Sequence, residues 1–416
     1  MPAKSRQTPT ILYTWAAAIA LMLAVAAALS FLAVQTMEST SSRIENNTGP
    51  VLISTQGLVA SLAEADAANT AVFLSGIDGG DEDVSQRRLY ESAIARAPQQ
   101  IEDISAGIGD DTATHDALKD VAQQLVEYAG VVEQARLSNT NGLAGADDLL
   151  SASLELTGGS NGMLVNADEV TERTQQQFND DLSAGRILLT LALVSLVLSL
   201  ALLFVAQMRL RYLTKRLINF GLAAATLAVV SLTIWLLLAG FGRTIDLDTA
   251  RDEGFGDIAL SAQLQTAAFD YKTRETGAII RERGEELPDP AVLDEIDATF
   301  AQLVAASDSD RESALITELS TRWERYLQIS GVISARVAQG NFDEARDEVG
   351  GEGNQTFNGF NTTLEALNLT NQEQFNASVA SAAARLRWLS FATILLPLFA
   401  AAFAWLGYRP RINEYF

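Results

Sequence analysis

The amino-acid sequence predicts an all-α integral membrane protein with four transmembrane helices and two tandem extracytoplasmic four-helix bundles. Four long apolar runs alternate with two long acidic segments, which explains how 48% hydrophobic residues coexist with a net charge of -23. Apolar residues recur at steps of three and four within both acidic segments, the spacing of helix seams. The second half of the chain repeats the pattern of the first, which indicates an internal duplication.

Each apolar run is long enough to cross a bilayer as a helix. The runs cover residues 11–34, 187–208, 217–242 and 388–408, and none contains Asp, Glu, Lys or Arg. A crossing helix needs about 20 apolar residues. The first run is longer than the roughly 7–15-residue core of a secretory signal peptide, so we expect an uncleaved anchor. Because proton and ion pathways usually need charged residues in the membrane, a transporter is disfavoured.

A short basic hinge between the second and third runs sets the predicted orientation. Arg209, Arg211, Lys215 and Arg216 lie within residues 209–216. Short cytoplasmic loops carry the excess of Lys and Arg, so the hinge and both termini are expected inside. An alanine-rich composition with arginine in excess over lysine is typical of a high-GC bacterium, so we expect a bacterial plasma membrane. The four basic residues serve either this orientation alone or contact with a cytoplasmic partner.

The predicted order along the chain follows from these assignments. It is a cytoplasmic N-terminus (1–10), span 1 (11–34), bundle 1 (35–186), span 2 (187–208), the basic hinge (209–216), span 3 (217–242), bundle 2 (243–387), span 4 (388–408) and a cytoplasmic tail (409–416). Small residues recur at every fourth position from Ala16 to Ala28, and Gly221 and Ala225 form a similar pair. Such stripes permit close helix contact within one chain or in a homodimer.

The two bundles carry matching seams. One consists of Leu118, Val121, Leu125, Tyr128, Val132 and Ala135, and the other of Ile316, Leu319, Trp323, Tyr326, Ser330, Ile333 and Val337. A shift of 198 positions places the first six residues of the second seam on the first, tyrosine on tyrosine. Thr70–Gly76 similarly resembles Thr276–Gly284. In bundle 1, helix breaks are expected at 76–83, 106–112, 138–147 and 157–162. The last helix, about 164–185, is expected to continue into span 2.

Composition excludes several kinds of chemistry. The chain has no Cys and a single His, His115, so no cofactor, thiolate metal site or histidine-based catalysis is expected. The strong negative charge disfavours nucleic-acid binding. The hinge and tail leave no room for a catalytic domain, so we expect a non-enzymatic protein. In the second acidic segment Lys272, Arg274 and Glu275 form a charged group, which is either an internal salt bridge or a contact for a ligand or partner.

The predicted arrangement is similar to the sensor four-helix bundles of bacterial chemoreceptors and sensor kinases, although no signalling domain follows the second span. It also resembles the GlnX-type four-pass transducers of actinobacteria, which are encoded beside serine/threonine protein kinase G. Two stretches carry this resemblance, Ala63–Gly76 and Glu253–Gly284. The resemblance implies that the ectodomains contact a solute-binding protein loaded with an amino acid, and that the cytoplasmic side influences a kinase.

Three functions therefore remain open from the sequence. The first is a non-enzymatic sensor that relays an extracytoplasmic signal to a cytoplasmic partner. The second is a structural membrane protein that organises an envelope complex, and the third is a direct receptor with a small-molecule pocket between bundle helices. Binding of the ectodomains to a loaded solute-binding protein favours the sensor. Ectodomains that are indifferent to ligand state favour the structural protein, and direct binding of a small molecule favours the receptor.

Overall fold

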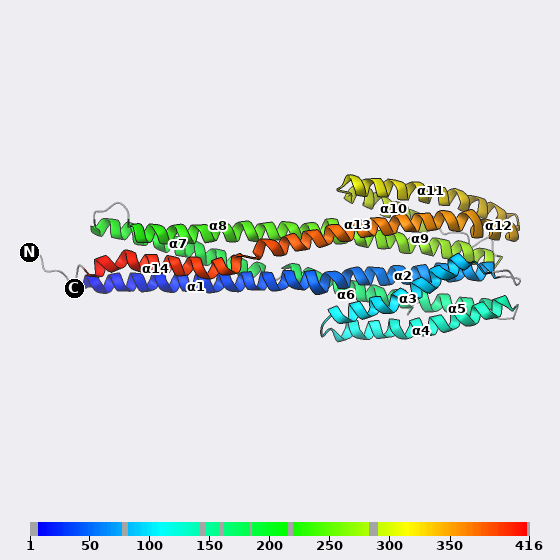
Figure 1. Cartoon of the computed structure of the whole chain (residues 1–416), viewed down its shortest axis with the longest axis horizontal. Coiled ribbons are helices and arrows are strands. Elements are labelled where there is room, and N and C mark those ends of the chain that lie inside the picture. Colours follow the sequence, from blue (N-terminus) through cyan, green and yellow to red (C-terminus); the bar gives the residue numbers. More distant parts are fainter. Residues whose placement is uncertain are drawn as a thin grey trace, which may run out of the picture. The chain divides into compact units, whose positions relative to one another are not determined.

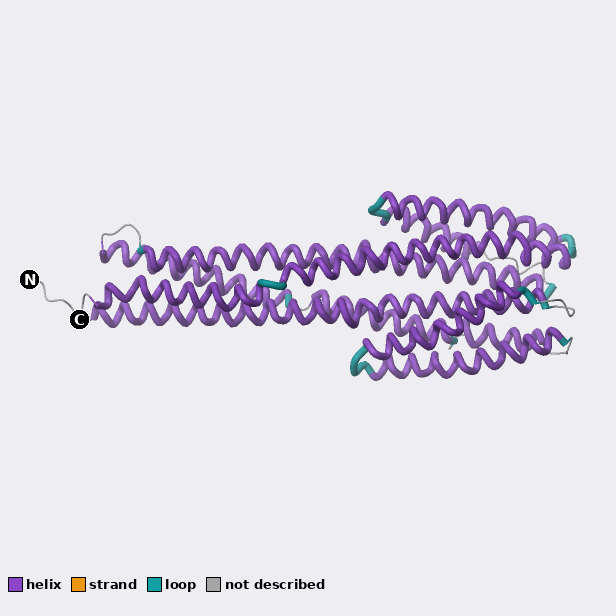
Figure 2. The backbone as a smooth tube through the Cα atoms, viewed as in Figure 1, coloured by secondary structure: helices purple, strands orange, loops and turns teal. Residues whose placement is uncertain are grey.

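The computed structural model describes residues 7–76, 82–141, 146–158, 162–183, 185–214, 219–282 and 290–413. Within these ranges every regular element is a helix, and the connecting turns are short (Figure 2). Contacts divide the chain into two compact units. Unit 1 comprises Met1–Ile44, Asn179–Asp248 and Ser378–Phe416, and unit 2 comprises Glu45–Phe178 and Thr249–Ala377. The prediction of an almost entirely helical protein is confirmed for the described residues.

Unit 1 contains the apolar helices. They are α1 (Gln7–Arg43), α7 (Arg186–Thr214), α8 (Phe220–Thr249) and α14 (Leu389–Asn413). Ile19, Leu196 and Leu232 lie in their shared core, while Leu191 and Phe399 are among the many large apolar side chains left exposed. In the described part of the chain, four helices are long and apolar enough to cross a membrane, and each overlaps one predicted span. A bundle that exposes apolar side chains on its outside fits a lipid environment.

Gly221 allows α8 to approach α14 closely. A Cβ atom placed on Gly221 would lie 2.5 Å from the carbonyl oxygen of Phe403 and 2.6 Å from the Cα of Gly407. Asn219 fixes this contact because its side-chain amide donates to the Gly407 carbonyl at 2.9 Å. The alanine stripe of α1 behaves differently, since only its first member, Ala16, is buried. The homodimer that the stripe suggested therefore stays a prediction.

Unit 2 holds two helical bundles. Bundle 1 consists of α2 (Gly49–Ser75), α3 (Val84–Gly107), α4 (Thr112–Thr140), α5 (Ala146–Gly158) and α6 (Met163–Ser183). Asp83 and Asp111 cap α3 and α4, each accepting from two backbone amides of the first turn. All six residues of the α4 seam, Leu118 to Ala135, are buried. The period read from the sequence thus identifies the buried face of this helix correctly.

Bundle 2 has the same plan and a more aromatic core. It consists of α9 (Gly256–Ile280), α10 (Pro290–Ala306), α11 (Asp310–Ala338), α12 (Phe342–Glu348) and α13 (Asn354–Leu386). Trp323 and Tyr326 of the α11 seam pack against Phe360 and Phe357 of α13, with ring centroids 5.3 and 5.1 Å apart. Tyr271 of α9 meets Trp323 edge-on at 5.5 Å. Such offset aromatic contacts add to the stabilisation that burial provides.

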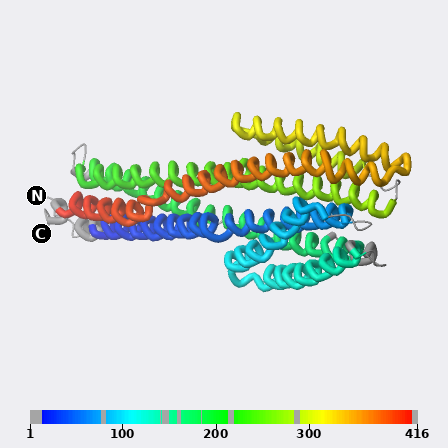
Figure 3. Tube along the Cα trace, turned by 45° about the vertical axis from the view of Figure 1, so that its right-hand side comes forward, coloured from blue at the N-terminus to red at the C-terminus, as the bar shows by residue number. Residues whose placement is uncertain are grey.

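Helices α2 and α9 form the centre of unit 2 (Figures 1 and 3). Most residues of both helices are buried, which explains why neither has a distinct polar face. Small residues dominate their contact, where Ala63 and Ala67 share a core with Ala267 and Leu264. The other helices of bundle 1 lie beside α2, and those of bundle 2 lie beside α9.

The chain enters and leaves each bundle differently. On entry, α1 leads into α2 through the π-helical segment η1 (Ile44–Thr48), and α8 leads into α9 through η3 (Ala250–Phe255), without a loop. On exit, α6 ends at Ser183 and Gly185 has a φ of 84°, which corrects the expectation that this helix continues into span 2. A left-handed glycine ends a helix because other residues avoid this conformation. Arg387 and Trp388 form a turn between α13 and α14.

Candidate ligand-binding grooves

The small residues between α2 and α9 leave a groove on each side of the helix pair. The larger groove encloses about 590 Å³ between α2 and α6 of bundle 1 and α9 and α10 of bundle 2. The smaller one encloses about 360 Å³ between α2, α3, α9 and α13. Both volumes fall within the range of about 300–1,000 Å³ that is typical of small-molecule sites. We call the larger one the acidic groove and the smaller one the amide groove.

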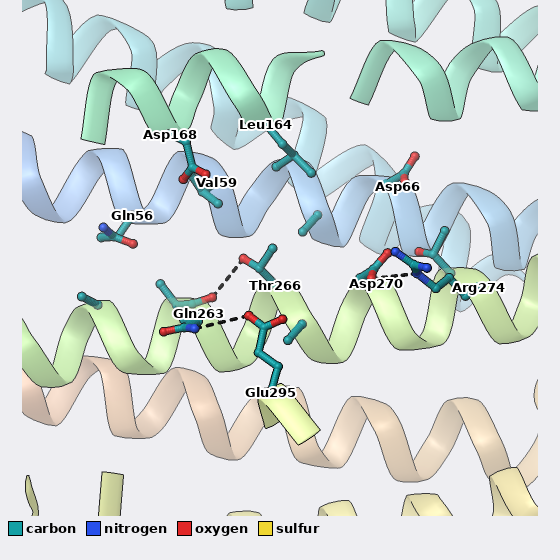
Figure 4. A pocket seen from close by; sticks show the side chains of 15 residues that line it. Gln56, Val59, Asp66, Leu164, Asp168, Gln263, Thr266, Asp270, Arg274 and Glu295 are labelled. Carbon is teal, nitrogen blue, oxygen red and sulfur yellow. Dashed lines mark hydrogen bonds and ion pairs between the residues drawn. The ribbon is translucent and has the colours of Figure 1, made fainter. Parts of the chain in front are cut away.

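The acidic groove gathers four carboxyl groups and one guanidinium from four helices (Figure 4). They belong to Asp66, Asp168, Asp270, Glu295 and Arg274. The Arg274 Nε donates to Asp270 at 2.8 Å, and the Gln263 amide donates to Glu295 at 3.3 Å. Figure 4 shows Asp66 on the α2 wall opposite this pair on α9. The groove therefore has an excess of negative charge with a single positive group near one end.

Burial changes the titration of these carboxyl groups. It raises the pKa of Asp66 to about 7, with a further rise from the charge of Asp270, although the Thr157 hydroxyl donates to Asp66 at 3.2 Å. Desolvation also raises the pKa of Asp168, and Glu172 adds to that rise. The pKa of Asp270 is raised by burial despite the opposing effect of Arg274. A ligand with an ammonium group would relieve this uncompensated negative charge.

The amide groove has a different chemistry. Glu64 forms an ion pair with Arg96 in its wall, and burial raises the pKa of Glu64 against the opposing effect of that guanidinium. Gln265, which also lines the groove, donates to Asn361 at 2.8 Å. The side-chain carbonyl oxygens of Gln100 and Asn368 are buried without a hydrogen-bond partner. The charged groups of this groove are that ion pair and the exposed carboxyl group of Glu365, so it offers mainly amide groups and fewer acids than the acidic groove.

A buried polar network lies inside bundle 2. The Lys272 ammonium donates to Asn354 at 2.6 Å, and Asn354 donates in turn to Asp83 of bundle 1 at 3.2 Å. Glu275 accepts from the hydroxyls of Tyr326, at 2.7 Å, and Ser330. Burial lowers the pKa of Lys272 to about 8 and raises that of Glu275, while each group's charge opposes the shift of the other. The network links the two bundles through the cap of α3.

The predicted site residues thus lie in two environments. Arg274 lines the acidic groove, whereas Lys272 and Glu275 are buried inside bundle 2, and the structure does not bring all three to one surface. On the basic hinge, the Arg209 guanidinium lies 5.1 Å from the centre of the Trp15 ring, and Arg211 is exposed. Lys215 and Arg216 lie outside the described residues. A ligand or partner role for any of these residues stays a prediction.

Sequence reasoning missed most of the acidic groove. Asp66, Asp168 and Glu295 come from three helices far apart in the chain, so no local spacing connects them. The seams identify the buried faces of α4 and α11, but they do not reveal that α2 packs on α9. Among the described residues, no group of three or more His, Asp or Glu side chains is placed to hold a metal ion.

Comparison with known protein families agrees with this architecture. Residues 40–183 match the model of an actinobacterial sensor domain, and residues 291–385 match that of a four-helix bundle sensory module for signal transduction. No curated protein and no solved structure gives a match. The first match covers all of bundle 1, and the second covers the last four helices of bundle 2. Both similarities support a place for this chain among sensors and signal transducers.

Proposed function

We propose that this protein is a non-enzymatic transmembrane sensor that relays an extracytoplasmic signal to a separate cytoplasmic partner. The observation that carries the proposal is the pairing of α2 with α9 at the centre of unit 2. Each of these helices follows a candidate membrane helix without an intervening loop. A signal that changes the packing of α2 on α9 therefore acts on the two helices that lead directly to spans 1 and 3. Packed helices pass on shifts of about 1–2 Å between discrete arrangements.

The signal in this proposal is amino-acid availability, reported by an extracytoplasmic solute-binding protein, and the cytoplasmic partner is a serine/threonine kinase. The support is the resemblance to GlnX-type transducers, together with the sensor-module matches of both bundles. With the termini inside, the basic hinge residues Arg209, Arg211, Lys215 and Arg216 are the proposed contacts for such a partner. In the described part of this hinge, Arg211 is exposed and available for contact.

A direct small-molecule receptor is the second candidate, and the acidic groove favours it. The groove has the volume of a ligand site, contains side chains from both bundles and carries opposite charges on its α9 wall. An amino acid or amine bound there would touch α2 and α9 together. This candidate differs from the first only in the outer ligand, because the relay through the helices is the same.

We also propose that the two halves arose by duplication. A shift of 206 positions, which places Thr70 on Thr276, also places the start of η1 on the start of η3. The shift of 198 that aligns the seams places the helix cap Asp111 on the helix cap Ser309. Matching π-helical segments and caps are independent of the seam residues, so they support a common origin for the two bundles.

The first test is affinity purification of the full-length protein from its native membrane, followed by mass spectrometry. Recovery of a solute-binding protein and a cytoplasmic kinase is expected, and an Arg211→Ala variant should lose the kinase while keeping the outer partner. Recovery of only cell-wall or division proteins would contradict the sensor and favour a scaffold.

Ligand binding to the purified full-length protein in nanodiscs then separates the two sensor candidates. A panel of amino acids is titrated against wild type, Asp168→Asn in the acidic groove, and Asp343→Asn as an exposed control. Direct binding that Asp168→Asn weakens would establish the receptor. No binding by the wild type, with retention of a loaded solute-binding protein, would establish the relay through a partner.

A further inference from the structure

Two buried carboxyl groups in bundle 2 lack the partners that buried charges need. Asp257 lies in the first turn of α9 and is 1% exposed, and neither of its carboxyl oxygens has a hydrogen-bond partner. Glu312 lies in the first turn of α11 and is also 1% exposed. Its Oε2 accepts from the Asp308 amide at 3.2 Å, whereas its Oε1 has no partner. Buried polar groups are usually satisfied, so both exceptions need an explanation.

The register of α9 and α11 places these two groups opposite each other. The two helices face each other further along, where Ser330 donates to Glu275, and Ser330 follows Glu275 by 55 positions. Glu312 follows Asp257 by the same 55 positions. Asp257 precedes Glu275 by 18 residues, which is five α-helical turns of about 3.6 residues, so it lies on the same face of α9. Glu312 also precedes Ser330 by 18 residues, so these two residues lie on the same face of α11.

The charged groups that act on Asp257 are all acidic, and the two nearby arginines are paired with other carboxyl groups. Glu253 of η3 and Asp308 before α11 act on Asp257 together with Glu312. The last turns of α10, residues 298–306, and the first half of α2, residues 49–63, contain no titratable side chain. On α13, residues 368–377 contain only Glu373, which pairs with Arg311 at 3.5 Å. The other nearby arginine, Arg251, lies 3.7 Å from Asp252.

An ionised carboxylate in such a place is strongly unfavourable. Burial costs the charged form its hydration, and nearby like charges add to that cost. Burial raises the pKa of Asp257 to about 8, with Glu312 the largest contributor among the neighbouring charges. Burial also raises the pKa values of Glu312 and Glu253. The neutral form of a carboxyl group avoids both costs and can donate a hydrogen bond to its neighbour.

We propose that the facing carboxyl groups of Asp257 and Glu312 form a proton-binding site that holds the first turns of α9 and α11 together. When the pair loses its proton, two facing negative charges remain in a buried position, and the two helix starts move apart. The site directly follows η3, where the chain leaves the span 3 helix and enters bundle 2. Proton release therefore acts at the entry to the bundle, as an input that is independent of any ligand in the grooves.

Bundle 1 provides an internal comparison. The shifts that align the two halves place Val51 on Asp257 and Thr114 on Glu312, and both bundle 1 residues are buried. Neither has an acidic side chain. The proton site is therefore a feature of bundle 2 alone, and the starts of α2 and α4 serve as a control within the same molecule.

The test is hydrogen–deuterium exchange of the full-length protein in nanodiscs at pH 6, 7 and 8, corrected for the chemical exchange rate. Because the native state binds more protons than the unfolded state in this range, stability falls as pH rises. Local opening of the starts of α9 and α11 should increase by up to about 10-fold per pH unit for each proton released. The starts of α2 and α4 should change little.

Variants of Asp257 and Glu312 test whether these residues cause the pH dependence, and added Ca²⁺ tests whether the site binds a metal cation instead of a proton. Asp257→Asn should remove most of the pH dependence, Glu312→Gln should reduce it, and Asp343→Asn, an exposed control, should leave it unchanged. Glu312→Gln alone is sufficient if Asp257→Asn fails to fold. An unchanged pH dependence in both variants, or none in the wild type, would overturn the proposal. Stabilisation at pH 8 by millimolar Ca²⁺ that a chelator reverses would also overturn it, because the site would then hold a metal cation.

Discussion

The two ends of α9 both bury a carboxyl group, and they do so in opposite surroundings. Glu275 accepts from two hydroxyl groups and lies near the Lys272 ammonium. Asp257 has no partner and three acidic neighbours. The difference shows that burial alone does not determine the role of a carboxyl group. Nearby hydrogen-bond donors make Glu275 a structural anchor that connects helices. Asp257 lacks such donors, and this makes it a site for a proton.

The largest effect is expected when the hydrogen-bonded carboxyl group of Glu275 is removed. Glu275→Ala should lower the free energy of unfolding by about 3–5 kcal/mol, because it removes the acceptor of the Tyr326 and Ser330 hydroxyls and the negative charge near the buried Lys272 ammonium. Glu275→Gln keeps an acceptor oxygen and should cost less. Denaturant unfolding of the full-length protein in detergent measures both. A cost for Glu275→Ala no larger than that of the exposed Asp343→Asn would contradict the anchor role.

Removing a donor should make Glu275 more like Asp257. Tyr326→Phe deletes the hydroxyl that donates to Glu275 at 2.7 Å, which should cost about 1.5–3 kcal/mol. It should also raise the pKa of Glu275 further, so stability should fall more steeply as pH rises through that pKa. Thermal unfolding at pH 5, 7 and 8.5 tests this slope. A loss of stability that is equal at every pH would argue against a titration effect.

Bundle 1 can be given the unpartnered acid that it lacks. Val51→Asp places a carboxyl group of similar size at the position that corresponds to Asp257. We expect a loss of about 1–3 kcal/mol for a buried polar group without a partner, larger at pH 8 than at pH 5. Val51→Thr, which adds a polar atom without a titratable one, is the matched control. Equal pH profiles for the two variants would show that the position itself is not sensitive to charge.

The smallest effect is expected at an exposed pair on the same helix. Arg274 and Asp270 are both about half exposed, so Arg274→Ala should change stability by only about 0.2–1 kcal/mol. It should nevertheless raise the pKa of Asp270, because the guanidinium lowers it in the wild type. Denaturant unfolding measures the change in stability, and ligand titrations on the same preparation report the change at Asp270. A loss above 2 kcal/mol would mean that the pair has a structural role.

The sequence predicted the helices of this protein better than its polar sites. The seams of α4 and α11 are buried at every predicted position, from Leu118 to Ala135 and from Ile316 to Val337. This works because a helix repeats every 3.6 residues and its buried face is visible locally. Asp257 gives no such signal, since an acid in the first turn of a helix is ordinarily a favourable exposed residue. Its burial depends on α10, α11 and α13, which only the folded bundle brings together.

The break at Gly185 illustrates the same limit on a smaller scale. The apolar pattern runs on from α6 towards span 2, so periodicity predicts a continuous helix. A single glycine with a φ of 84° ends it instead. Glycine adopts such a conformation readily, but a sequence does not reveal which glycine does so.

The π-helical segments also bear on insertions and deletions. A π-helical turn holds more residues than an α-helical turn, because its hydrogen bonds join residues five apart instead of four. Deleting one residue within Ile44–Thr48 should therefore leave an ordinary α-helix whose two flanking faces keep their directions. The same deletion inside α2 would rotate everything beyond it by about 100°. At the entry into each bundle, the length of this chain can thus change by one residue without turning a buried face towards solvent.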